Sequence, residues 1–349
     1  NPIKDWDAYE MELKNRLGLD NKLIRNITEK AQRSPKRVVF AEADNIKILK
    51  AAQTSLEEGV AIPILLGKKN IIESLIEEYS LELQGVEIID PKSDDEKERR
   101  QAFGRAFFEK RMRKGVTEYE AIQVMRERNH FGSMMVDMGD ADAMISGLTR
   151  NYRDVVRPAL HAIGLQKGMN KIAGMYILMT KRGPLFLADT TINRNPTAED
   201  IAEITSNVAK TIRKFKVTPR VALLSYSNFG SSPGEDSNKM SKAVELIREN
   251  DPNLVVDGEL QANFALNSRL MNEKFSFSTL ANKNVNTLIF PNLSSGNIAY
   301  KLLQEITEVD AIGPVLVGLR KSVHVLQMGS SVREIINMVK VAVVDAQNK

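Results

Sequence analysis

Residues 313–338 read GPVLVGLRKSVHVLQMGSSVREIINM and give the clearest indication of the fold. Residues 315–319 form a short apolar run between a Gly-Pro pair and a charged turn, which predicts a buried strand. A loop is expected over residues 321–330. Ligands of an open α/β sheet bind in the crevice outside the carboxyl ends of its strands, so this loop is a candidate ligand-binding segment.

A helix is predicted directly after this loop. Ser331 and Glu334 have the spacing of a capping box, which marks the start of a helix. The apolar residues that follow share one helical face, namely Val332, Ile335, Ile336, Val339 and Val343. The amino end of a helix attracts anions, which strengthens the case for a ligand at the loop. We expect this helix to pack on the first of two domains.

Length and composition narrow the class of protein. The 349 residues suffice for two domains, and a net charge of +4 with interspersed acids and bases lacks the dense basic stripe of a nucleic-acid binder. A small anionic ligand is more plausible. The absence of cysteine excludes thiol catalysis, cysteine-bound zinc and disulfides. Without a signal peptide or an apolar run long enough for a membrane span, a cytoplasmic location is expected.

The order of strands and helices predicts two α/β sheets. Strand patterns at residues 37–40, 60–66, 86–89 and 142–147 alternate with helix patterns, which favours a parallel, doubly wound sheet. A second set begins with an expected hairpin over residues 172–189, at the edge of a second sheet. Further strands are expected at residues 221–225, 254–256 and 287–290, and a helix with Pro196 at its start. An amino-terminal helix is expected to carry Trp6, Tyr9, Leu13 and Leu17 on one face and to end at Gly18.

Two polar segments are candidate ligand sites. Ser146, Thr149, Arg150 and Arg153 gather where the strand at residues 142–147 ends, and hydroxyl and guanidinium groups there can surround a phosphate or carboxylate. An ordinary helix start with surface arginines explains the same pattern. The Gly- and Ser-rich residues 225–236 either hold a polar ligand or form a plain loop.

Several familiar catalytic motifs are absent from the sequence. It contains no Walker loop, no GxGxxG after a strand, no HExxH and no GxSxG. His130, His161 and His324 are far apart in the sequence, so a zinc site or a serine hydrolase is disfavoured and no metal site is predicted.

Five segments together resemble the phosphate acetyltransferases, which move an acetyl group between coenzyme A and phosphate. They occur in the family's order and spacing and read LADTTINRNPTAEDIAEI, LLSYSNFGSS, DGELQANFAL, IFPNLSSGNIAYKLLQ and GPVLVGL. The chain is more similar still to the carboxyl-terminal part of bacterial hybrid NADP-dependent malic enzymes, through DWDAYEMEL, PKRVVFAEAD and GLTRNY. Because the chain begins at Asn1 without a methionine, we interpret it as an excised part of such a polypeptide.

The resemblance implies an α/β fold of two domains with doubly wound, mostly parallel sheets and a ligand cleft between them, as in phosphotransacetylases and isocitrate dehydrogenases. Residues 1–36 would form helices that lead from an upstream linker. The first domain would comprise residues 37–161 and 315–349. Residues 162–314 would form the second domain and carry a dimerisation surface.

The resemblance also implies where transfer chemistry takes place. In active members the loop equivalent to residues 325–329 carries a Ser-Arg pair just before its glycine, and an acid follows five residues after that glycine. The serine contacts the coenzyme A thiol, the arginine binds phosphate and stabilises developing negative charge, and the acid is the proposed base. Here Gln327 and Met328 occupy the pair position and Glu334 occupies the acid position.

Other family positions are partly retained. Glu305 replaces a family arginine, whereas Arg111 and Ser146 match family residues of the anion site. Glu305 also has the spacing of a helical ion pair with Lys301. Glu334 also has the spacing of a capping residue, and this structural role does not exclude its role as a base. No residue is assigned a firm catalytic role. The expected ligand-binding residues are Arg111, Ser146, Thr149, Arg150, Ser227, Asn297, Gln327, Gly329 and Ser330.

The function implied is regulation. The chain would bind acetyl-CoA or another acyl-CoA and a phosphate-like anion, none of them covalently, and would regulate oxidative malate decarboxylation with little or no acetyl transfer of its own. NADP and a divalent metal are expected only in the attached malic-enzyme domain. A homodimer or higher homo-oligomer is expected, with no nucleic acid and no membrane as partner. The alternatives are an active phosphate acetyl- or butyryltransferase and a purely structural oligomerisation module.

Overall fold

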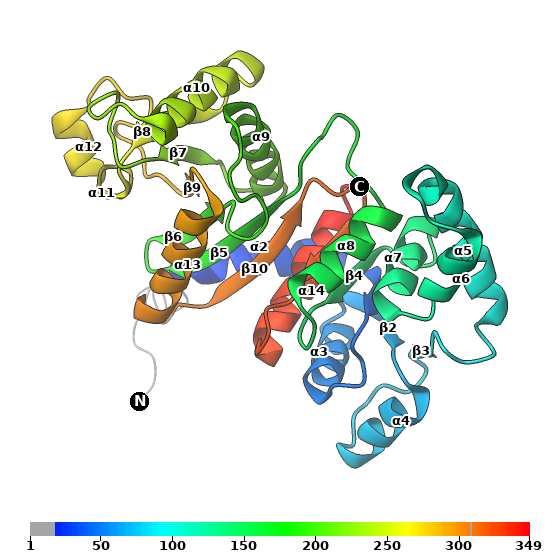
Figure 1. Ribbon diagram of the computed structural model, residues 1–349. Helices are drawn as coiled ribbons and strands as arrows, with labels where there is room; N and C mark the ends of the chain where they lie inside the picture. The colour runs from blue at the N-terminus through cyan, green and yellow to red at the C-terminus, as the bar shows by residue number, and fades with distance from the viewer. Residues whose placement is uncertain (1–17, 308) are drawn as a thin grey trace, which may run out of the picture. The chain divides into compact units, whose positions relative to one another are not determined.

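The computed structural model describes residues 18–307 and 309–349 (Figure 1). They divide into two compact units, which we describe separately. Unit 1 contains residues 18–27 and 173–312, and unit 2 contains residues 28–172 and 313–349. The domain boundaries predicted from the sequence lie after residues 161 and 314, and the predicted cleft between the domains stays a prediction. No described helix is long and apolar enough to span a membrane.

Unit 2 is built on a five-stranded parallel sheet in the order β11-β4-β1-β2-β3. The strands are β1 (Lys36–Phe40), β2 (Ala61–Leu66), β3 (Glu87–Ile89), β4 (Ala143–Ser146) and β11 (Ser322–Val325). Its helices are α3 (Ile46–Glu57), α4 (Lys69–Glu78), α5 (Lys97–Arg111), α6 (Glu118–Val124), α7 (Arg128–Met138), α8 (Tyr152–Ala162) and α14 (Val332–Ala346), with a short 3-10 turn at Met112–Lys114. The alternation of strands and helices confirms the predicted doubly wound parallel sheet.

Strand β11 corrects the expectation of a loop over residues 321–330. Its four residues are fully buried and pair with β4, so that Ser322 lies opposite Ala143 and Val325 opposite Ser146. The polar side chains SVHV obscured the strand in the sequence. They are satisfied inside the unit, because the Ser322 hydroxyl donates to the Ala342 carbonyl at 2.9 Å and the Leu316 amide donates to His324 Nδ1 at 3.1 Å.

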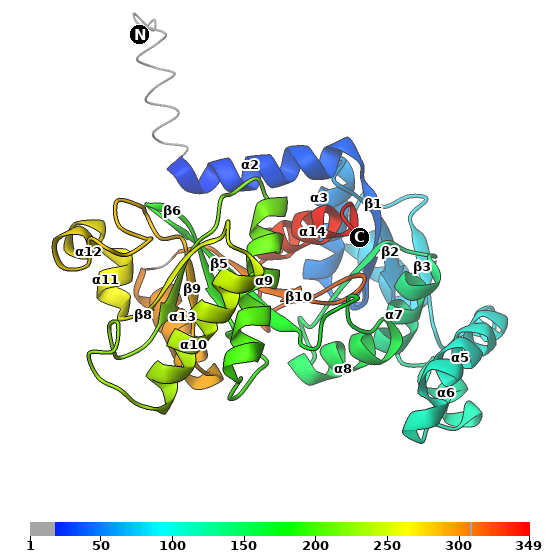
Figure 2. The ribbon, with the colours of Figure 1, turned by 90° about the horizontal axis from the view of Figure 1, so that it is seen from above.

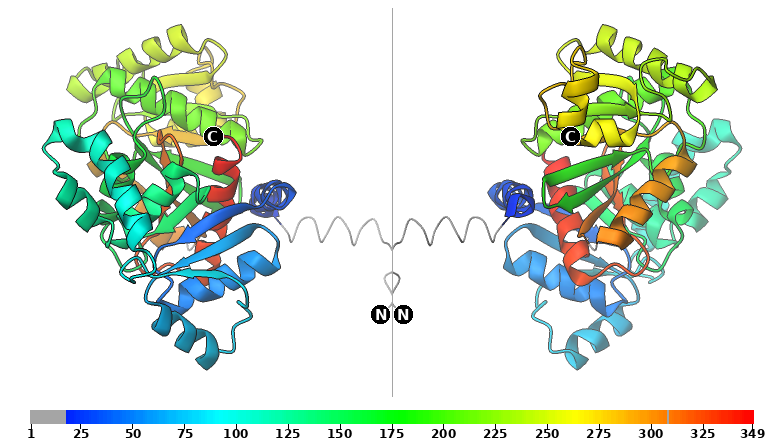
Figure 3. Two further views of the ribbon diagram at one scale, coloured as in Figure 1. Left: turned by 90° about the vertical axis from the view of Figure 1, so that its right-hand side faces the viewer. Right: turned by 90° about the vertical axis from the view of Figure 1, so that its left-hand side faces the viewer.

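Helix α14 begins at the predicted capping box. Ser331 Oγ accepts from the Glu334 amide at 3.2 Å, and the Glu334 carboxylate accepts from the Ser331 amide at 2.7 Å. The helix packs on α3 and across β4, β1 and β2, and Figure 3 shows it in red beside the blue strands of the same unit. Ile335, Val339 and Val343 are buried in this contact. The predicted packing of the last helix on the first domain is thus seen within unit 2.

Unit 1 is built on a six-stranded sheet in the order β10-β5-β6-β9-β7-β8 (Figure 2). The strands are β5 (Ala173–Thr180), β6 (Gly183–Ala188), β7 (Arg220–Leu224), β8 (Val255–Leu260), β9 (Thr287–Ile289) and β10 (Ala311–Val317), of which residues 313–317 of β10 are counted in unit 2. β5 and β6 form the expected antiparallel hairpin, while β6, β9, β7 and β8 run parallel. The hairpin is not at the edge of the sheet, because β10 lies outside β5.

Helices cover both faces of the unit 1 sheet. They are α9 (Ala198–Lys214), α10 (Glu235–Asn250), α11 (Ala262–Leu266), α12 (Ser268–Lys274) and α13 (Leu293–Thr307). α9 and α10 pack on each other and on β6, β7 and β8. Pro196 precedes the N-cap of α9, Thr197, instead of starting the helix. Gly18 is the first described residue and lies in α2 (Gly18–Arg33), and the helix expected from Trp6 to Leu17 with its end at Gly18 lies outside the described residues.

The capping box of α14 makes a testable prediction about stability. Replacing Ser331 by Ala removes the acceptor of the Glu334 amide, so the free energy of unfolding should fall by about 1 kcal/mol in urea denaturation. Ser331→Thr keeps the hydroxyl and is the matched control. Equal midpoints for the Ala and Thr variants would contradict this role of the hydroxyl.

Candidate functional site

A buried carboxylate organises the carboxyl edge of the unit 2 sheet. Glu42 follows β1 and is 1% exposed. One of its oxygens accepts the amides of Gly147 and Leu148 at 2.6 and 2.8 Å, and the other accepts the amide and the hydroxyl of Thr149. Hydrogen bonds to a carboxylate are charge-assisted and strong. Glu42 therefore fixes the loop that follows β4, and the Thr149 hydroxyl is already bound to it.

The loops after β4 and β11 lie side by side. The Leu326 amide donates to the Ser146 carbonyl at 2.7 Å. Gly147 has a φ of +116°, and a Cβ added there would lie 2.8 Å from the Leu326 carbonyl oxygen, so no side chain fits. The structure thus brings the start of the loop after β4 beside the start of the loop after β11.

The hydroxyl of Ser146 is bound within the unit. It donates to Asn129 Oδ1 at 2.8 Å, and Asn129 Nδ2 donates to the Asp154 carbonyl at 2.9 Å. Both Ser146 and Asn129 are buried. This chain of hydrogen bonds links β4 to α7 and α8.

An ion pair lies at the same edge of the sheet. Arg128, the first residue of α7, binds the Asp44 carboxylate through both of its terminal nitrogens at 2.6 and 2.9 Å. The hydrogen bonds from Arg128 lower the pKa of Asp44. The nearby positive charge of Arg150 lowers this pKa as well. Arg150 is therefore close to an acid and is partly neutralised by it.

A cationic cluster lies on the helices of unit 2, and we define it as Arg111, His130, Arg157 and His161. Arg111 ends α5, His130 belongs to α7, and the other two belong to α8. Burial, and to a smaller extent the electrostatic interactions with Arg111, Arg157 and His130, together lower the pKa of His161 to about 4. His161 is thus neutral at pH 7, and the charges of Arg111 and Arg157 act on it. Arg111 Nε is buried and has no hydrogen-bond partner among the described residues.

This cluster suits an anion, and the sequence predicts only Arg111 of its four members at an anion site. His130 and His161 are far apart in the sequence, but α7 and α8 pack together, and both His130 and Arg111 act on His161. His324 is buried in β11 instead. A usable signal was present, because His161 follows Arg157 by four residues and so shares its helical face.

Other cations of unit 2 are neutralised. Arg320 pairs with Asp137 and donates through Nε to the Ile163 carbonyl at 3.1 Å. Lys110 pairs with the same carboxylate. Asp137 therefore holds two cations, and Arg320 is not available to a ligand without breaking these bonds.

The loop after β11 carries no cationic side chain. Gln327 is partly buried, Met328 is 65% exposed and Ser330 is 8% exposed. Lys47 Nζ donates to the Ser330 carbonyl at 3.2 Å. Gly329 has a φ of +87°, a conformation that glycine adopts readily. Glu334, bound in the capping box, has a structural role, and its role as a base stays a prediction.

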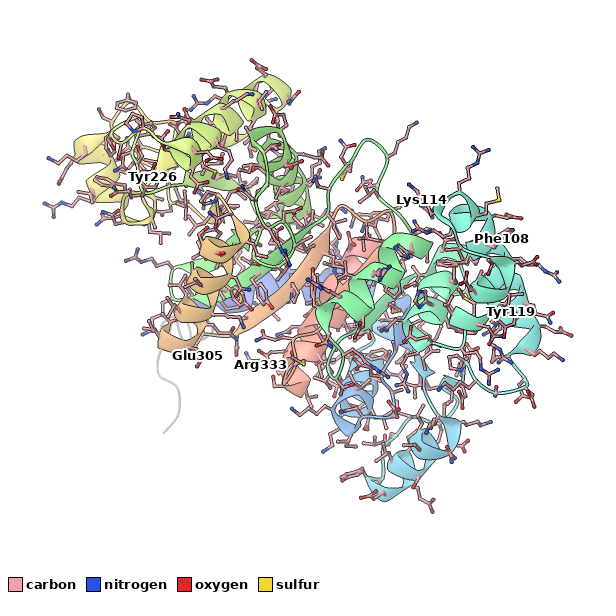
Figure 4. The ribbon with its side chains drawn as sticks, in the orientation of Figure 1. Phe108, Lys114, Tyr119, Tyr226, Glu305 and Arg333 are labelled. Carbon is pink, nitrogen blue, oxygen red and sulfur yellow. The ribbon has the colours of Figure 1, made fainter. Side chains whose placement is uncertain are left out.

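The candidate residues of unit 1 are described separately. The Ser227 hydroxyl is buried and donates to Glu259 at 2.9 Å, so its partner is internal. Asn297 Nδ2 donates to the Thr190 carbonyl at 3.1 Å. Glu305 is exposed on α13, where Figure 4 labels it. No ion pair joins Glu305 to Lys301 among the described side chains, and Lys301 lies over the Tyr300 ring instead. Ligand roles for Ser227 and Asn297 stay predictions.

Metal ligands do not converge in the part of the chain that the structure describes. Within residues 18–307 and 309–349, no group of three His, Asp or Glu side chains is arranged to hold an ion. The chemistry available at the edge of unit 2 is therefore hydrogen bonding and positive charge. This edge of the sheet can bind an anion, but the loop after β11 contributes no cationic side chain to it.

Comparisons with known proteins agree with this architecture. The sequence profile described as "Phosphate acetyl/butaryl transferase" matches residues 22–343. NADP-dependent malic enzyme of Escherichia coli is 38% identical over 100% of this chain and 46% of its own length. Phosphate acetyltransferase of Clostridium acetobutylicum is 36% identical over 93% of this chain and 98% of its own length. The crystal structure of a phosphotransacetylase from Streptococcus pyogenes superposes with a TM-score of 0.86 at 33% identity, covering 94% of this chain and 99% of that one.

Two kinds of relative therefore match the same residues. The chain spans about half the length of the malic enzymes that it resembles, and nearly the whole length of the phosphate acetyltransferase. The two mostly parallel sheets agree with the solved phosphotransacetylases. Because the family profile covers most of the sequence, this chain belongs to the phosphate acetyl/butaryl transferase family.

Proposed function

We propose that this chain is the phosphotransacetylase-like part of a hybrid NADP-dependent malic enzyme, where it binds an acyl-CoA and regulates oxidative malate decarboxylation. It has little or no acetyl transfer of its own. The single observation that carries this proposal is the loop after β11, in which Gln327 and Met328 stand where the resemblance implies a Ser-Arg pair.

Loss of the pair removes the chemistry of transfer. A thioether carries no charge, so Met328 cannot offset the negative charge that develops in the transition state. Removing one donor to such a charge typically costs about 10²- to 10³-fold in rate. Glu305 adds a negative charge where the resemblance implies an arginine. Arg320 does not substitute for the missing cation, since Asp137 already pairs with it.

Anion recognition is supported by the cationic cluster. Arg111 and Arg157 act on a neutral His161, and Arg111 Nε has no described partner. A phosphate group of coenzyme A would neutralise these cations. Ligand binding regulates an attached domain when it favours one arrangement of the assembly through differential affinity.

An assembly of identical chains is also proposed. α13 exposes Ile298, Leu302 and Ile306, which are 59%, 54% and 76% exposed and follow one another at intervals of four residues. Such a spacing places them along one side of the helix. A contiguous apolar stripe of this kind supports a protein contact, as a homo-oligomer requires.

An active phosphate acetyl- or butyryltransferase is the alternative. The near full-length match to a phosphate acetyltransferase favours it, together with the cationic cluster. In this case Arg111 or Arg150 would supply the charge that Met328 lacks. A purely structural module would instead show no binding of acetyl-CoA in calorimetry.

An assay of acetyl transfer separates the first two functions. With acetyl phosphate and coenzyme A, the wild-type chain should form acetyl-CoA far more slowly than the ~1–10³ s⁻¹ usual for enzymes. The double variant Gln327→Ser, Met328→Arg should be about 10²-fold or more faster, because it restores a donor and a charge. A wild-type turnover number within the usual range would overturn the regulatory proposal in favour of the active enzyme.

The pH dependence of unfolding tests the cationic cluster. The pKa of His161 is about 4 in the folded chain, below its ordinary value of 6.5, so the unfolded chain binds more protons between these pH values. The free energy of unfolding should therefore fall as the pH is lowered from 6.5 to 4. His161→Gln should reduce this slope relative to wild type. A slope identical in the two proteins would contradict the lowered pKa.

The same imidazole reports anion binding by NMR. The chain has three histidines, so His161 can be assigned by comparison with His161→Gln. Inorganic phosphate bound at the cluster should raise the midpoint of the His161 titration, because a negative charge favours the protonated imidazole. His324, buried in β11, is the internal control. A His161 midpoint that does not change with phosphate would exclude an anion site at this cluster.

A further inference from the structure

Unit 1 contains a pocket of about 1230 Å³ that the proposed function does not use. Its lining includes the turn at residues 181–182 before β6, residues 216–218 before β7 and residues 283–286 before β9. It thus lies where these parallel strands begin. Asp189 and Ser227 follow β6 and β7 at the opposite, carboxyl edge, where ligands of doubly wound sheets usually bind. The pocket is therefore separate from the residues that the family resemblance assigns.

Positive charge dominates this pocket. Six basic residues line it, namely Lys22, Lys181, Arg182, Lys216, Arg220 and Lys283. No aspartate or glutamate is among its described lining residues, and none of the six basic residues forms an ion pair with a described acid. Like charges without counter-ions repel one another, so an anion that enters the pocket is attracted by all of them.

The basic residues that do make hydrogen bonds donate to backbone oxygens. Arg182 donates to the Leu266 carbonyl at 3.1 Å, and Lys283 donates to the Thr279 carbonyl at 2.9 Å. Arg220 donates through Nε to the Asn284 carbonyl. Burial lowers the pKa of Arg220, and no acidic group offsets this effect. Since an arginine stays charged, an anion beside Arg220 would compensate for its lost hydration.

The backbone of Lys216 also points to a role for its side chain. Lys216 has a φ of +58°, in the left-handed region that glycine occupies without steric cost. It is exposed and belongs to the pocket lining just after the end of α9. A glycine would relieve the strain at this position, so the lysine has some cost in stability. Strained residues of this kind gather at functional sites.

Apolar and amide groups complete the lining. Leu178, Leu185 and Val285 contribute apolar surface, and Asn26 and Asn267 contribute amides. The pocket exceeds the ~300–1,000 Å³ typical of sites for small organic ligands, so it has room for more than inorganic phosphate. We propose that it binds an organic polyphosphate of nucleotide size. The phosphates would contact the lysines and arginines, and the organic part would lie on the apolar side chains.

Two sources share this chemistry, a nucleoside triphosphate and coenzyme A. Calorimetric titration of the whole chain with magnesium-free ATP, with coenzyme A and with inorganic tripolyphosphate distinguishes them. ATP or coenzyme A should bind at least tenfold more tightly than tripolyphosphate, because only these have an organic part. Binding should weaken as salt is raised. No measurable heat from ATP or coenzyme A would overturn the proposal.

The variants Lys216→Gly and Lys181→Gln locate the binding. Each should weaken ATP or coenzyme A binding about tenfold, since a charge-assisted contact is lost. Lys216→Gly should keep or raise the thermal midpoint because glycine suits the backbone there, so weaker binding cannot be ascribed to misfolding. Lys210→Gln, which removes an exposed charge from α9 outside the pocket, is the matched control. Equal affinities for the control and the double variant Lys181→Gln, Lys216→Gly would overturn the site.

Arg111→Gln separates this inference from the proposed function. Loss of coenzyme A binding in Arg111→Gln but not in the double variant would assign coenzyme A to the cationic cluster, and unchanged ATP binding in the double variant would then overturn the pocket. Loss in the double variant but not in Arg111→Gln would support the pocket while removing the cluster as the coenzyme A site. The proposal of the pocket and the proposal of the cationic cluster can therefore be rejected independently of each other.

Discussion

The hydrogen bonds of the Glu42 carboxylate are the constraint on which the edge of unit 2 depends. A buried charge without partners costs far more free energy than a buried apolar group, so this acid requires the three amides and the hydroxyl that it accepts. The loop after β4 in turn requires the acid, because its amides point into the unit. Unit 1 uses the same device after β6, where buried Asp189 accepts the amides of Thr191, Ile192 and Asn193.

This scaffold separates the stability of the fold from the chemistry of the loop after β11. Glu42, Asn129 and Ser146 hold the edge of the sheet through their own contacts, and none of their described hydrogen bonds involves the side chains of Gln327 or Met328. Residues in the loop can therefore change without loss of the edge. The cationic cluster is similarly independent, since its members belong to α5, α7 and α8. A family member can thus lose a transfer group and retain an anion site.

The sequence predicted those features that depend on local pattern. The alternating elements from β1 to β4, the β5–β6 hairpin and the capping box at Ser331 are confirmed because each is encoded within a few consecutive residues. Strand β11 was missed since two of its four buried residues, Ser322 and His324, are polar and their hydrogen-bond partners lie outside the strand. The role of Glu42 was missed because its partners lie more than a hundred residues away. The basic residues of the pocket come from several separate loops, which no local pattern could connect.

The order of the segments has a consequence for biosynthesis. Unit 2 is interrupted by residues 173–312 of unit 1, and both β11 and α14 follow that insertion. The ribosome therefore synthesises β1 to β4 well before α14, the helix that packs on them. The apolar surface of these strands stays uncovered while residues 173–312 are synthesised. Unit 1 apart from its α2 residues is contiguous and can condense during this interval. Protection of that waiting surface by a chaperone would favour correct assembly of the nascent chain.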